Sequence, residues 1–194
     1  MNLRQTINHY TDGSNYDLIV LGTNGKDDNY QLFFDTRGYQ VIKDIHCPML
    51  IVPEDWRYDS IDSIVFASDF EERKQSLPLD FMRTFQSQLT LLQLGEITVS
   101  IDQLIDTESL EGEESEILQD NIKNWEDAES LFKWLSERND DLLVLHTKHR
   151  NWVEDTFHQL LNDKPHNVSL PAMIYFVEAK QFNKEKASKE SIGA

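Results

Sequence analysis

One pattern occurs twice in this sequence and most limits the folds that the chain can adopt. In it, an apolar run ends in a loop, a helix-length segment follows, and a second apolar run begins after proline. The first copy contains Asp17-Leu-Ile-Val-Leu-Gly-Thr-Asn-Gly25 and Pro48-Met-Leu-Ile-Val52, and the second contains Asp141-Leu-Leu-Val-Leu-His-Thr-Lys-His149 and Pro171-Ala-Met-Ile-Tyr175. Continuous apolar runs are typical of strands buried on both faces of a parallel sheet. Each copy therefore predicts a β-α-β unit.

The remaining periodicity extends this alternation along the chain. It predicts strands over 18–21, 49–52, 61–66, 89–94, 117–118, 142–145 and 171–177, and helices over 1–15, 30–45, 79–85, 125–135 and 153–161. Residues 96–114 have no clear period, residues 54–60 are polar and indicate a linker, and we expect 179–194 to form a disordered tail. Strands that alternate with helices predict an α/β fold with a mainly parallel sheet and flanking helices.

The charge of the chain excludes several classes of partner. Its formal net charge is -17, and much of the acidic excess lies between residues 101 and 141. Such a chain repels nucleic acid phosphates and anionic membranes, so we expect neither as a partner. We interpret the acidic region as a solvated face, and a docking surface for a basic protein partner is the alternative. The sequence lacks an apolar run of membrane-spanning length and a signal peptide, and it has one cysteine, so we expect a cytoplasmic protein.

The motifs of the first copy resemble a known family. Asp17-Leu-Ile-Val-Leu-Gly-Thr-Asn-Gly25 and Cys47-Pro-Met-Leu-Ile-Val-Pro53 resemble the closing half of a universal stress protein domain, and the run IDSIVFASD over 61–69 resembles its opening strand. The resemblance implies the Rossmann-like fold of that family, also described as adenine-nucleotide alpha hydrolase-like. It further implies a tandem protein, with the closing half of a first domain in residues 1–54 and a second, degenerate domain in 61–178. By the repeat, we expect roughly 60 residues to be missing from the first domain.

The resemblance also points to a vestigial nucleotide site. Nucleotide-binding members of the family have Gly-x2-Gly-x9-Gly-(Ser/Thr) after the fourth strand, where glycines let the backbone approach phosphate oxygens. Gly22, Gly25 and Thr36 match this motif in the first copy, but Asp35 replaces the third glycine. We expect the carboxylate of Asp35 to oppose a triphosphate.

The second copy retains the opposite half of this site. Asp69 follows the predicted strand at 61–66, where family members have an Asp that contacts the nucleoside, whereas His146 and His149 stand at the two glycine positions. Two imidazoles would fill the phosphate space. We expect a composite site of Gly22, Gly25, Thr36 and Asp69 to require a rearrangement of the tandem pair.

Other chemistry has weaker support in the sequence. His146, His149 and His158 suggest metal ligands, but they lack a placed cysteine or carboxylate, so we assign no metal site. We interpret Cys47 as a packing residue and assign no catalytic residue.

Three functions follow, in decreasing order of support. The first is a non-enzymatic stress-response or regulatory protein that acts by association, either as a homo-oligomer or as an intrachain pseudo-dimer that pairs 49–52 with 171–177. The second is an ATP-binding sensor, with ATP as its only candidate cofactor and with slow hydrolysis. The third is a metal-dependent activity at the histidine loop.

Overall fold

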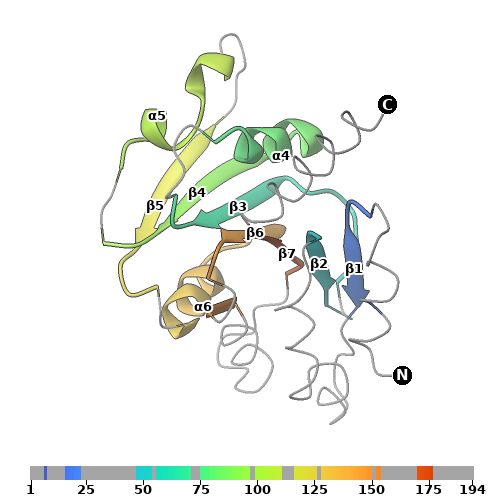
Figure 1. The fold of residues 1–194 in the computed structure, drawn as a ribbon. Coiled ribbons are helices and arrows are strands. Elements are labelled where there is room, and N and C mark those ends of the chain that lie inside the picture. Colours follow the sequence, from blue (N-terminus) through green and yellow to red (C-terminus); the bar gives the residue numbers. More distant parts are fainter. Residues whose placement is uncertain are drawn as a thin grey trace, which may run out of the picture.

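A seven-stranded sheet runs through the chain, with the strand order β1-β2-β7-β6-β3-β4-β5 (Figure 1). The computed structural model describes residues 7, 16–22, 47–53, 56–70, 75–96, 99–110, 116–125, 128–149, 152–153 and 170–176. The strands are β1 (Ile19–Gly22), β2 (Met49–Val52), β3 (Ser63–Ser68), β4 (Gln88–Leu94), β5 (Ile117–Ile122), β6 (Leu142–Thr147) and β7 (Ala172–Phe176).

Five strands, from β7 through β6, β3 and β4 to β5, are parallel to their neighbours. The pair β1 and β2 is also parallel, and among the described strands only the junction between β2 and β7 is antiparallel. The prediction of an α/β fold with a mainly parallel sheet is therefore confirmed. It succeeds because the apolar runs are continuous, as the burial of all six residues of β6 requires.

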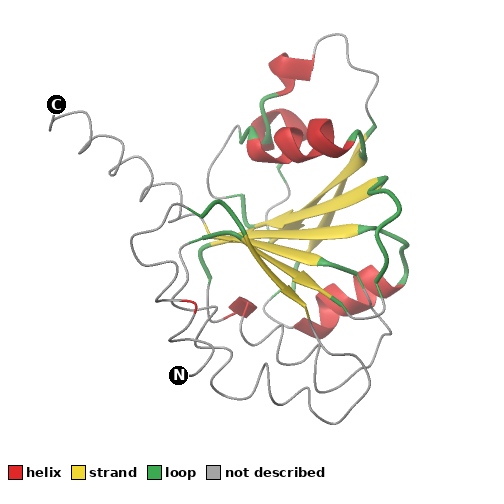
Figure 2. Cartoon of the chain, turned by 90° about the vertical axis from the view of Figure 1, so that its right-hand side faces the viewer, coloured by secondary structure: helices red, strands yellow, loops and turns green. Residues whose placement is uncertain are grey.

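Helices lie on both faces of the sheet (Figure 2). The helix α4 (Leu77–Phe85) packs on one face through Leu79 and Met82, and α6 (Ala128–Ser136) packs on the other through Leu131, Phe132 and Leu135. The segment over 96–114, for which the sequence shows no period, contains α5 (Ile101–Leu104) and the 3₁₀ helix η1 (Thr107–Leu110). None of the described helices is long and apolar enough to cross a membrane.

Several predicted element boundaries change in the structure. β3 begins and ends two residues later than the predicted strand at 61–66, and β5 continues to Ile122 rather than ending at 118. Its sequence ILQDNI is polar because β5 is an edge strand, so an apolar run could not reveal its length. The predicted helices over 1–15, 30–45 and 153–161 and the predicted tail lie largely outside the described residues.

The two sequence repeats have the same strand register. Ile19 is level with Met49 in β1–β2, and their counterparts Leu143 and Ala172 are level in β6–β7. The equivalent hydrogen bonds also recur, since the Ile19 N–H donates to the Pro48 carbonyl at 2.9 Å and the Leu143 N–H donates to the Pro171 carbonyl at 3.0 Å.

An approximate two-fold axis relates these two units. Across the antiparallel junction Leu50 pairs with its own counterpart Met173, while Met49 pairs with Ile174 and Ile51 with Ala172. Residues 49–52 and 171–177, for which the sequence allows pairing within one chain or between two chains, thus lie side by side in one chain.

The end of α4 offers a first prediction about stability. Gln86 caps this helix in the left-handed conformation, with φ 56° and ψ 39°, and its side chain is exposed. Glycine adopts this conformation without the steric cost of a Cβ atom. We expect Gln86→Gly to raise the free energy of unfolding by about 0.5–1 kcal/mol in urea denaturation. Gln88→Gly in β4 is the control, and it should lower stability because glycine weakens strands.

Candidate functional site

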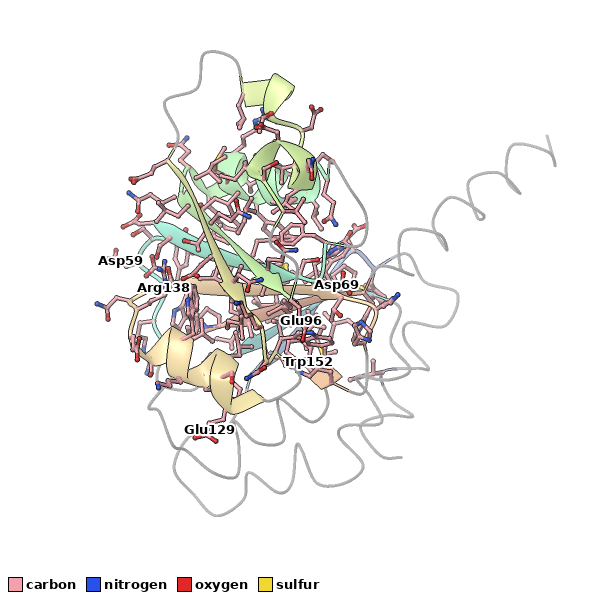
Figure 3. All side chains as sticks on the ribbon, turned by 90° about the vertical axis from the view of Figure 1, so that its left-hand side faces the viewer. Asp59, Asp69, Glu96, Glu129, Arg138 and Trp152 are labelled. Carbon is pink, nitrogen blue, oxygen red and sulfur yellow. The ribbon has the colours of Figure 1, made fainter. Side chains whose placement is uncertain are left out.

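The carboxyl ends of β3 and β6 bring together the polar groups on which a site could be built. Asp69 follows β3, and His149 follows β6. Their side chains meet, because His149 Nε2 lies 3.4 Å from Asp69 Oδ2. The Asp69 side chain is 14% exposed and that of His149 is 38% exposed, so the pair stands at the border of the solvent. In Figure 3, Asp69, Glu96 and Trp152 lie toward one end of the strands, and Arg138 lies toward the other.

The backbone beside Asp69 is strained. Phe70 has φ 48°, although its side chain is bulky and completely buried. A non-glycine residue in this region costs about 1–2 kcal/mol, so the surroundings must impose the conformation. The Phe70 N–H donates to Ser68 Oγ at 3.0 Å, and the Phe70 ring lies 6.1 Å from that of Phe66. These contacts hold the turn that places Asp69 just after the carboxyl end of β3.

His146 is a core residue in this structure. It is 1% exposed, and its ring lies 5.5 Å from Phe66 and 6.0 Å from Tyr175. Its Nδ1 lies 3.4 Å from Ser68 Oγ, so the imidazole also has a polar neighbour. The side chain therefore fills the space at the end of β6 and joins β3 to β7.

His149 lies between the Asp69 carboxylate and a pair of tryptophans. Its ring lies 5.1 Å from Trp125, which packs edge-on against Trp152 at 5.2 Å. Trp152 Nε1 donates to the Trp125 carbonyl at 2.8 Å, and the His149 N–H donates to Thr147 Oγ1 at 3.0 Å. The backbone hydrogen bond to Thr147, the Asp69 carboxylate and the Trp125 ring thus together orient the imidazole.

Gly22, the first predicted phosphate-loop residue, ends β1. Its φ lies outside the left-handed region, and a Cβ atom there would meet no atom of the described residues within 4 Å. The packing of the described residues therefore does not require glycine at this position. Gly25, Thr36 and Asp35 lie outside the described residues.

Gly22 and Asp69 are not brought together. The strands β1 and β3 are separated by β2, β7 and β6, which places them four strand spacings, about 19 Å, apart. Because β2 and β7 are antiparallel, β1 and β3 run in opposite directions. Their carboxyl ends therefore lie at opposite ends of the strands. The composite nucleotide site is therefore not formed by these two residues.

The remaining predicted ligands do not form a metal centre in the described part of the chain. No group of three His, Cys, Asp or Glu side chains there could hold a metal ion. His146 is turned into the core, Asp69 and His149 form only a pair, and His158 lies outside the described residues.

Cys47 is half-buried at the start of β2. Its thiol donates to the Tyr16 carbonyl at 3.2 Å. Burial raises the pKa of the thiol above its usual range, and the neighbouring Asp17 carboxylate raises it further. A raised pKa leaves little thiolate near neutral pH, which agrees with a packing role.

Sequence reasoning missed an amide network at the ends of β4 and β5. Asn121 Nδ2 donates to the Gly95 carbonyl at 2.8 Å and to that of Gln93 at 3.2 Å, while Gln93 Oε1 accepts from the Val99 N–H at 3.0 Å. Gly95 has φ 151°, which explains the glycine at this turn. The network fixes the loop after β4, and no motif in the sequence marks it.

Comparison with known proteins supports the fold. No protein-family model and no curated protein matches the sequence. The structure is similar to the crystal structure of a universal stress protein from Archaeoglobus fulgidus DSM 4304, with a TM-score of 0.52 and 14% sequence identity. The match covers 84% of this chain and 61% of that protein. At this identity the likeness shows the fold, so this chain has a universal stress protein-like α/β fold.

Proposed function

We propose that this chain is a regulatory or stress-response protein of universal stress type that acts by association and not by catalysis. The observation that carries this proposal is the filling of the candidate nucleotide site. Where nucleotide-binding members of the family have glycines, His146 packs into the core and His149 lies against Asp69. The carboxylate that would contact a nucleoside thus has an imidazole of the same protein 3.4 Å away.

The pairing of β2 with β7 supports association as the mode of action. Two equivalent pairs of parallel strands, β1–β2 and β6–β7, meet through β2 and β7, with the symmetric pair Leu50 and Met173 at the centre. This contact has the form of an interface between two copies of one unit. An interface of this kind within one chain leaves the other surfaces of the protein available for a separate partner.

An ATP-binding sensor is the second candidate. The observation that favours it is the strained turn at Phe70, which holds Asp69 at the carboxyl ends of parallel strands. Ligands of open α/β sheets bind at such ends, and strained residues are frequent at functional sites.

A thermal titration with ATP and Mg²⁺ separates the two candidates. Under the association proposal we expect the melting temperature to stay within about 1 °C up to millimolar ATP, because the site is filled. A ligand present at 100 times its Kd would stabilise the protein by about 2.7 kcal/mol, or roughly 5–10 °C for a chain of this length. Such a rise would overturn the proposal, and its persistence in Gly22→Asp would show that Gly22 takes no part.

A further inference from the structure

The two edges of the sheet are protected differently. At one edge, β5 carries Gln119, Asp120 and Asn121, which discourage pairing with another strand. At the other edge, β1 has the sequence IVLG and carries no charge. Its Val20 is 59% exposed, and Leu18 and Tyr16 just before it are 39% and 52% exposed. An apolar edge strand of this kind is a template for pairing with a further strand.

Exposed apolar side chains gather in and just before β1. Leu18 and Val20 are two residues apart at the start of β1, so they share a face, and Tyr16 precedes them before the bend at Asp17. We call these three exposed side chains the β1 apolar face. Register places Val20 level with Leu50 and Met173, and this row continues to Val144 and Phe66.

Burial changes along this row. Val144 and Phe66 are completely buried in the cluster to which α4 contributes Leu79 and Met82, whereas Leu50 and Met173 are half-buried and Val20 is exposed. The described residues therefore cover this face at one end of the sheet and leave it open at β1.

The internal repeat shows what would cover it. β1 is the counterpart of β6, and the edge of β1 that faces away from β2 corresponds to the edge of β6 that β3 occupies. There β3 pairs in parallel, with Ile64 level with Leu142 and Phe66 level with Val144. Leu18 and Val20 are the counterparts of Leu142 and Val144, so the same register on β1 would place an incoming strand opposite them.

Asp17 adds an acceptor for such a strand. Its counterpart Asp141 accepts hydrogen bonds through Oδ2 from the N–H groups of Asp62 and Ser63, both at 3.0 Å, at the start of β3. Asp17 is exposed beside the open edge of β1. A strand that pairs with β1 as β3 pairs with β6 would bring two backbone donors to this carboxylate.

We propose that β1 accepts, from a different polypeptide, a parallel strand followed by an amphipathic helix, which together close the open edge and cover the β1 apolar face. This partner deepens the proposed association role, and the inference rests on that role. A second copy joined through β1 fits less well. Antiparallel pairing about a two-fold axis would put both apolar faces on one side, uncovered, and the net charge of -17 on each copy opposes contact.

The test uses a labelled peptide with the sequence of residues 61–85 as a stand-in for the partner. We expect saturable binding to the full chain by fluorescence anisotropy, with slower hydrogen exchange over 18–22. Val20→Lys should weaken binding at least tenfold, and Asp17→Ala should weaken it several-fold. Leu118→Lys is the matched control, since Leu118 is a 42% exposed apolar residue of the opposite edge strand, and it should leave binding unchanged.

A fused version covers the case of weak binding. A second copy of residues 61–85 joined ahead of Met1 by a flexible linker has an effective concentration near millimolar. We expect this fusion to melt roughly 5 °C above one that carries the scrambled segment, and Val20→Lys should remove the difference.

Three outcomes would overturn the inference. These are equal melting of the intact and scrambled fusions, equal loss of binding in Leu118→Lys, and a dimer of the unmodified chain that Val20→Lys abolishes. The ATP titration separates this failure from that of the proposed function. A rise in melting temperature with ATP and Mg²⁺ would reject the association role, whether or not the peptide binds.

Discussion

Replacing Asp141 by alanine is expected to lower the free energy of unfolding by about 3 kcal/mol. Asp141 Oδ2 accepts hydrogen bonds from the Asp62 and Ser63 N–H groups at 3.0 Å and from Ser63 Oγ at 2.9 Å. The Asp141 N–H in turn donates to Ser63 Oγ at 3.1 Å. Removal of the carboxylate would leave the donors at the start of β3 without this partner, and hydrogen bonds to charged groups contribute about 1.5–3 kcal/mol each. Urea denaturation measures the change.

Asp62→Ala is the matched control for this substitution. Asp62 is exposed, and its contribution to the network is a backbone N–H that alanine retains. We expect a change within about 0.5 kcal/mol. Combining Asp141→Ala with Ser63→Ala should cost less than the sum of the two single changes, because the residues share one network. Equal losses in Asp141→Ala and Asp62→Ala would show that the loss does not come from the hydrogen bonds of the Asp141 carboxylate.

The same residue shows how far sequence reasoning reaches. The sequence aligns Asp17 with Asp141, and that alignment predicts a repeated unit, whose equal registers in β1–β2 and β6–β7 agree with it. The physical basis is that short continuous apolar runs, bounded by glycine or proline, are consistent with strands buried on both faces of a sheet. The alignment does not predict that Asp141 binds the start of β3. That contact joins residues more than 70 positions apart, and the sequence holds no signal of the pairing.

The candidate site was predicted less completely than the fold. Asp69, His146 and His149 were all singled out by position, and all lie at or near the carboxyl ends of β3 and β6. Their different roles depend on rotamer and depth, because His146 turns into the core while His149, three residues later, reaches Asp69. The left-handed Phe70 was also unforeseen, since phenylalanine is rarely found in that conformation.

The antiparallel junction explains why a motif search alone misleads here. A glycine motif near the start of the chain and an aspartate after β3 look complementary in sequence. Because β2 and β7 are antiparallel, β1 and β3 run in opposite directions, and Gly22 and Asp69 lie at opposite ends of the strands. Topology therefore separates Gly22 from Asp69 within one chain, independently of the chemistry of either residue.

The second large effect is expected at this junction. Ile174 is completely buried, and it is level with Met49 on one side and Leu145 on the other. We expect Ile174→Ala to lower the free energy of unfolding by about 3–4 kcal/mol. The loss is large because the neighbouring strands are fixed in the sheet and cannot move together to fill the cavity that the substitution leaves. Amides of β1 and β2 should then exchange faster with solvent than those of β4, since β7 alone among the described strands joins them to the rest of the sheet.

Met173→Ala is the matched control, because it removes the side chain of the preceding residue from the opposite face of the same strand. Met173 is half-buried in the row that leads to the β1 apolar face. We expect a loss of about 1 kcal/mol, less than for a fully buried site, because part of the side chain is already in contact with water. Losses of equal size would show that both faces are equally covered at the junction, and they would contradict the open face on which the proposed strand-and-helix partner depends. A large loss confined to Ile174→Ala would locate the core of the junction on the α6 side of the sheet.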